Sequence, residues 1–189
     1  MQLKNLILAT LAVAFISTAS FANNNTDPKN DKEVVKKSNE TEETIVSVAA
    51  SNENFTTLVA AVKAAGLVDV LNGNGPFTVF APVNSAFDKL PKGTVGTLLK
   101  KENKSLLTAI LTYHVVAGKF NAKDVVAAIK KNNGKFVIKT VQGGKLTASI
   151  SNGNVILTDV KGNTSKVIIT DVKASNGVVH AIDSVVMPQ

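Results

Sequence analysis

The spacing of apolar residues predicts helices in the first two-thirds of the chain. Phe55, Leu58, Val59 and Val62 recur every three or four positions, so they share one face of a helix over residues 51–66. Further helical patterns cover residues 84–91, 94–101, 103–115 and 122–131. An apolar run over residues 77–82 predicts a buried strand.

After residue 134 the apolar positions alternate with polar ones. This alternation is typical of half-buried strands, and the intervening segments QGG, SNGN and KGNTS are turn sequences. The predicted strands cover residues 135–141, 145–150, 154–159, 166–172 and 177–186. Helices followed by an antiparallel meander predict one domain of the α+β class.

Four polar residues and one glycine have predicted structural roles. Asn84 or Ser85 can cap the helical turn that follows the first strand. Asn176-Gly177 is expected to supply the positive backbone angles of a tight hairpin turn. In the last strand the residues two positions before and after His180 are apolar, so all three side chains lie on the same side of the strand. The ring of His180 is therefore expected to point inward and to be hydrogen-bonded.

Residues 1–22 resemble a secretory signal peptide, with Lys4 in a positive n-region, an apolar core over residues 6–16, and a small-x-small site ending at Ala22. The alternative is a membrane anchor, but the apolar run is shorter than the roughly 20 residues that span a bilayer. The mature chain is therefore expected to begin at Asn23 as a secreted protein, extracellular or periplasmic, without a transmembrane anchor.

Two segments follow the cleavage site. Residues 23–43 are polar and charged, which predicts a disordered tether. Residues 44–189 are long enough to form one domain with its own core, and a monomer is expected. Without cysteine, this domain has no disulfides to stabilise it.

Charge limits the classes of partner. Residues 44–189 carry 16 lysines against eight acidic residues, and the whole chain lacks arginine. A basic exported domain attracts acidic polysaccharide, anionic lipid head groups or an acidic protein, although the lysines can also serve only to keep the protein dispersed. Nucleic acid is not expected as a partner, because arginine is absent and aromatic residues are few.

Catalytic chemistry is not evident in the sequence. The absence of cysteine excludes thiol catalysis and cysteine-based zinc sites. No G-x-S-x-G, H-E-x-x-H or phosphate-binding glycine loop is present. We therefore expect no enzyme activity, no cofactor and no metal site.

Three segments in this order resemble the fasciclin (FAS1) family. They are FTVFAPVNSAF (77–87), YHVVAG (113–118) and NGVVHAIDSVVMP (176–188). The resemblance covers residues 44–189 and implies a FAS1-like fold, with N-terminal helices packed on an antiparallel β-sandwich or wedge. Val83 and Ala181 depart from the residues that are common in the family.

The resemblance also implies candidate adhesion residues, because the Tyr-His region of animal family members is implicated in integrin binding. The positions that match this region are Tyr113, His114, Val115 and Val116. A second adhesion segment of the family, Asp-Ile, is matched loosely by Asp171 and Val172. From the residues alone, Tyr113 and His114 follow Ile110 on an apolar helix face, which favours a place in the core over a binding surface.

These observations predict a secreted cell-adhesion or extracellular-matrix module, which binds an extracellular or envelope protein or an acidic cell-surface polysaccharide. Two alternatives remain open. One is a carrier of a small apolar ligand, such as a pigment or lipid, and the other is a structural or sensory envelope protein.

Overall fold

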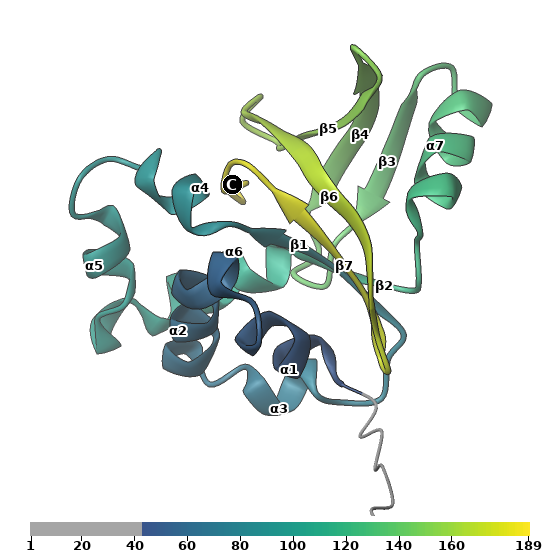
Figure 1. Cartoon of the computed structure of the whole chain (residues 1–189). Helices are drawn as coiled ribbons and strands as arrows, with labels where there is room; N and C mark the ends of the chain where they lie inside the picture. Colours follow the sequence, from purple (N-terminus) through teal and green to yellow (C-terminus); the bar gives the residue numbers. More distant parts are fainter. Residues whose placement is uncertain (1–42) are drawn as a thin grey trace, which may run out of the picture. The chain divides into compact units, whose positions relative to one another are not determined.

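The computed structural model describes residues 43–189 (Figure 1). The predicted signal peptide and residues 23–42 of the predicted tether lie outside the described residues. The helical elements are α1 (Ile45–Ala50), η1 (Glu53–Phe55), α2 (Thr56–Ala65), α3 (Val68–Leu71), α4 (Asn84–Asp88), α5 (Thr94–Leu98), η2 (Lys101–Asn103), α6 (Lys104–Tyr113) and α7 (Ala122–Lys131). Across this described part, no helix combines the length and apolar character needed to cross a membrane.

The described strands form one seven-stranded sheet in the order β2-β1-β7-β6-β5-β4-β3. They are β1 (Phe77–Pro82), β2 (Val115–Ala117), β3 (Lys135–Lys139), β4 (Lys145–Ser151), β5 (Asn154–Thr158), β6 (Thr164–Ala174) and β7 (Gly177–Ile182). The antiparallel meander from β3 to β7 confirms the α+β class. The β1–β7 pair, by contrast, is parallel, so the sheet is mixed.

The two ends of the sheet approach each other beside β2. Val116 forms an isolated antiparallel bridge with Thr140, just after β3. The Val141 N–H also donates to the Val115 carbonyl oxygen at 2.7 Å. These contacts bring the edge strands β2 and β3 together, so the sheet is nearly closed.

Two clusters of buried side chains lie on opposite faces of the central pair β1 and β7. Because side chains alternate along a strand, Val79 and Val179 face the helices α1, α2 and α6, which cover one face in Figure 1. Phe80 and Ile182 point the other way, into a second cluster that α7 completes with Val125 and other residues. The central strands therefore contribute to both clusters.

The structure contradicts the predicted role of Asn176-Gly177. Neither residue has a positive φ, although they do lie at the β6–β7 hairpin. Gly177 is required by close packing instead, because a Cβ there would lie 2.1 Å from the Phe77 carbonyl oxygen. The Asn176 side chain accepts from the Ile45 N–H at 3.0 Å and donates to the Leu71 carbonyl oxygen at 2.7 Å, and so holds α1 against α3.

The predicted cap at Asn84 or Ser85 is also wrong. Helix α4 has Val83 at its N-cap and no side-chain cap. The Asn84 Oδ1 instead accepts from the Thr57 N–H at 3.0 Å, in the first turn of α2. Asn84 therefore satisfies a helix N-terminus 27 residues away in the chain.

Candidate functional site

Tyr113, the first candidate residue, is the last residue of α6 and is fully buried. Its hydroxyl donates to the Lys145 carbonyl oxygen at 2.6 Å. Its ring lies against Gly144, where a Cβ would come within 2.6 Å of the tyrosine Cε2. Burial raises the pKa of the Tyr113 hydroxyl, which stays protonated and serves as a donor.

His114 follows as the C-cap of α6, and its ring is only 2% exposed. Nδ1 lies 2.8 Å from the Ile110 carbonyl oxygen and must carry the proton to donate to it, while Nε2 accepts from the Val186 N–H at 3.3 Å. Burial lowers the pKa of His114 to about 4, so the ring is neutral at neutral pH. His114 thus joins α6 to the C-terminal segment.

Val115 and Val116 are buried in β2, where they pair with Val79 and Thr78 of β1. Tyr113 and His114 therefore lie in the core, as their apolar spacing predicted, and Val115 and Val116 lie there with them. None of their side chains presents a surface that a partner can contact in this conformation.

Asp171 and Val172 lie at an irregularity of β6, where the pairing with β7 shifts register. Asp171 has a φ of 59°, and its carboxylate accepts from the Ala122 N–H at 2.8 Å at the start of α7. Its own N–H donates to Nδ1 of His180 at 3.2 Å. In the sheet order, β1 and β7 separate this segment from β2. The structure therefore does not bring the two candidate segments together.

The ring of His180 points inward and is hydrogen-bonded, which confirms that prediction. It is 2% exposed, and Nε2 lies 2.8 Å from the Phe120 carbonyl oxygen. Both nitrogens of each histidine are thus occupied by partners in the fold, and neither imidazole is free to act as a catalytic base. Within residues 43–189, no group of three His, Cys, Asp or Glu residues is placed to hold a metal ion.

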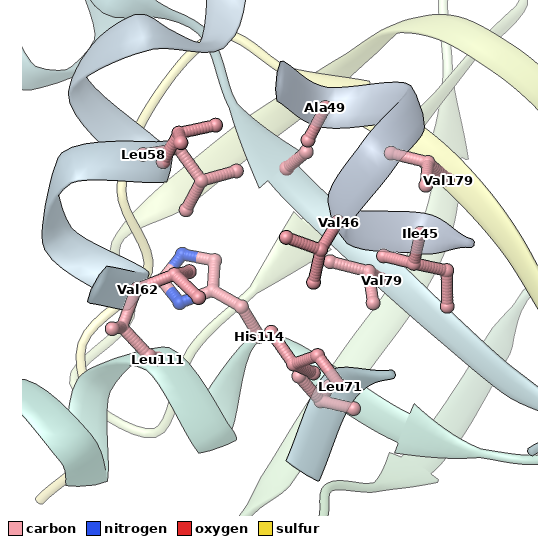
Figure 2. Close-up of a pocket in the computed structure, with 13 residues that line it drawn as sticks. Ile45, Val46, Ala49, Leu58, Val62, Leu71, Val79, Leu111, His114 and Val179 are labelled. Atoms are coloured by element: carbon pink, nitrogen blue, oxygen red, sulfur yellow. The ribbon is translucent and has the colours of Figure 1, made fainter. Parts of the chain in front are cut away.

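A small apolar cavity lies between α1, α2, α6 and the strands β1 and β7 (Figure 2). Aliphatic side chains such as Val46, Leu58 and Val179 form its walls, and His114 is the polar side chain among them. Its volume is about 30 Å³, enough for roughly two waters by size. A pigment or a lipid tail does not fit into this space unless an element moves.

Exposed lysines on the strands are the feature that the sequence reasoning did not single out. Lys135 and Lys139 of β3 alternate with the inward-facing Phe136 and Ile138. The signal was visible in the segment KFVIK, since strand alternation places both lysines on the face opposite the core.

Comparisons with known proteins agree with this fold. Residues 53–188 match the family model of the fasciclin domain. Protein sll1483 of Synechocystis sp. is 51% identical over 145 residues, which cover 77% of this chain and 73% of that protein. Immunogenic protein MPB70 of Mycobacterium bovis is 43% identical over 149 residues, covering 76% and 68%.

A more distant relative and a solved structure extend these comparisons. Transforming growth factor-beta-induced protein ig-h3 of Sus scrofa is 37% identical over 145 residues, which cover 77% of this chain and 19% of that protein. A solved FAS1 domain pair from the insect cell adhesion molecule Fasciclin I has a TM-score of 0.67 at 19% identity, over 75% of this chain and 50% of that one. The protein is therefore a member of the fasciclin (FAS1) domain family.

Proposed function

We propose that this protein is an exported, non-enzymatic adhesion module that binds an extracellular or envelope protein or a cell-surface polysaccharide. The observation that carries the proposal is the large excess of unpaired positive charge on a fasciclin domain. Residues 44–189 contain 16 lysines, and in the described part of the chain only Lys89 forms an ion pair, with Asp183 at 3.1 Å. Such a surface favours a partner that carries negative charge.

In this proposal the residues of the Tyr-His segment have a structural role. Tyr113 and His114 bind backbone groups of distant segments, and Val115 and Val116 pair with β1. The adhesive contacts are therefore assigned to exposed residues elsewhere on the domain. Asp171 and Val172 are half-buried and hold the irregular part of β6 in place.

A carrier of a small apolar ligand is the second candidate, and the aliphatic lining of the cavity favours it. The cavity is too small for such a ligand, so α1, which supplies Ile45, Val46 and Ala49 to the lining, would have to move. A carrier purified from its native host should contain coloured or solvent-extractable apolar material. Protein that adheres and contains no such material supports the adhesion module.

Adhesion is tested with the mature protein labelled at its N-terminus and native envelope or matrix preparations from its host. We expect saturable binding that weakens as NaCl is raised, because exposed charges are screened by salt. A heat-unfolded sample serves as the control. Absence of saturable binding by the folded protein to any of these preparations contradicts the proposed function.

A further inference from the structure

The outer face of strands β3 to β6 carries lysines and hydroxyl groups. On β3, Lys135, Val137 and Lys139 are exposed, while Phe136 and Ile138 turn toward the core. The pairing register places the outward-facing side chains of β4, β5 and β6 on the same face as these three residues. We call this surface the lysine face; its polar members are Lys135, Lys139, Lys145, Thr147, Ser149, Ser151, Asn154, Thr158, Thr164 and Lys166.

The register of the strands fixes where the four lysines lie. Lys139 is directly opposite Lys145, so these two residues are cross-strand neighbours at one end of the face. Lys135 lies in a cross-strand row with Ser149 and Ile156 that ends at Lys166. The two ends of this row are three inter-strand spacings apart, a distance of about 14 Å.

Hydroxyl groups occupy the space between the lysines. Thr147, Thr158 and Thr164 form the neighbouring cross-strand row, which begins at Val137 of β3. The face therefore presents lysines near its ends, with hydroxyl groups and the apolar side chains of Val137 and Ile156 between them. The strand register fixes the backbone positions of these residues, and the flexible lysine stems let the ammonium groups reach an anionic group on a partner.

The lysine face contains no carboxylate. Asp159 is buried and accepts from the N–H groups of Lys161 and Asn163, at 2.9 Å each. Asp183, directly after β7, accepts from the Lys166 backbone N–H at 2.8 Å and forms its ion pair with Lys89 at 3.1 Å. Within residues 43–189, no ion pair involves a lysine of this face. Its positive charge is thus available to a ligand.

We infer that the lysine face binds a linear acidic polysaccharide, an inference that rests on the proposed adhesion function and names its partner. The repeated carboxylates of such a chain match the lysines, and its hydroxyls match the threonine and serine side chains. The face also lacks the tryptophan or phenylalanine anchors that insert proteins into a lipid surface. The cross-strand rows of polar side chains give an extended chain a series of groups to contact as it lies across β3 to β6.

The test uses the mature protein and polygalacturonate, a linear polyuronate, with dextran as the neutral comparison. The face variant replaces Lys135, Lys139, Lys145 and Lys166 by glutamine. Loss of four ion pairs is expected to weaken binding to polygalacturonate about 30-fold, and the wild-type affinity should fall as NaCl is added.

Two control variants separate the site from net charge and from folding. The first replaces four exposed lysines near α5 and α6 by glutamine, at Lys92, Lys100, Lys101 and Lys104. It loses the same charge, and its binding is expected to stay within about threefold of wild type, since long-range attraction is screened by salt. The second replaces the four lysines of the lysine face by arginine, which should retain binding.

Several results would overturn the inference. One is that the first control variant and the face variant lose the same affinity for polygalacturonate. Another is that the wild-type protein binds polygalacturonate no better than dextran. The third is that it binds phosphatidylglycerol vesicles and does not bind the polyuronate. If the face variant still adheres to native envelope preparations as wild type does, the inference fails and the proposed function stands. If wild type adheres to none of them, the proposed function itself fails.

Discussion

At the scale of single residues, Tyr113 is held by both its ring and its hydroxyl. Tyr113→Ala removes a fully buried ring and is expected to lower the free energy of unfolding by about 3–5 kcal/mol. Tyr113→Phe keeps the ring and removes the hydrogen bond to Lys145, so a loss of about 1 kcal/mol is expected. Urea unfolding of both variants measures these losses. A stable Tyr113→Ala protein that fails to adhere would instead make Tyr113 a binding residue.

His114 makes the stability of the fold depend on pH between the pKa values of its ring in the folded and the unfolded chain. Its pKa is about 4 in the folded protein against 6.5 in the unfolded chain, so the unfolded chain takes up a proton first as pH falls. Stability is therefore complete above pH 6.5 and declines between pH 6.5 and pH 4. Below that range both states are protonated, and this group makes no further change. The total loss is about 3 kcal/mol.

Urea unfolding at a series of pH values between 7 and 4 measures this decline. His114→Gln cannot take up a proton in this range, so most of the decline should be absent from that variant. It should also be less stable at pH 7, because glutamine does not reproduce both ring contacts. A His114→Gln protein with the same pH profile as wild type would show that another group is responsible.

At the scale of elements, two glycines give opposite expectations. At Gly177 an added Cβ would lie 2.1 Å from the Phe77 carbonyl oxygen, between the paired strands β1 and β7. Gly177→Ala is therefore expected to cost about 3 kcal/mol or more. Gly96 lies in α5 with no atom within 4 Å of an added Cβ, and Gly96→Ala should stabilise by about 0.5–1 kcal/mol. Thermal unfolding of both variants checks the contrast, and a mild effect at Gly177 would contradict the packing argument.

The sequence predicted elements whose signal is local. Alternation identified β3 to β7, and apolar spacing identified α2, α6 and α7. It did not predict the parallel pairing of β1 with β7, because 100 residues separate the paired positions Phe77 and Gly177 and no local pattern encodes such a contact. Asn84 was misassigned for the same reason, since the helix it caps is distant in the chain.

The candidate site shows the same limit. The parity of His180 and the apolar spacing around Tyr113 correctly predicted that both side chains point inward. The lysine face was not predicted, because a surface of this kind needs the register of four strands. KFVIK shows which face Lys135 and Lys139 occupy, but Lys166 joins them only once β4 and β5 are in place.

At the scale of the whole molecule, export remains a prediction that a mass measurement can test. The n-region, the apolar core and the small-x-small site predict cleavage after Ala22. The intact mass of material recovered from the medium or periplasm should therefore correspond to a chain that begins at Asn23. Recovery of exported protein that retains residues 1–22 would contradict the prediction.

The two buried clusters are expected to unfold together, because β1 and β7 contribute side chains to both. Val79 and Val179 belong to the cluster beneath the helices, while Phe80 and Ile182 belong to the other. If either cluster comes apart, one face of the β1–β7 pair is exposed to water. The two strands then also lose the packing that holds them against the remaining cluster.

The chain has a single tyrosine and no tryptophan, so its tyrosine fluorescence reports on the cluster that contains Tyr113. Circular dichroism at the helical band reports mainly on the helices that cover the other cluster. We expect the two signals to give the same urea midpoint, as a small two-state domain does. Midpoints that differ beyond error would mean that the helices detach from the sheet before it unfolds. That result would also favour the carrier alternative, because movement of α1 is what an apolar ligand requires to enter the cavity beside His114.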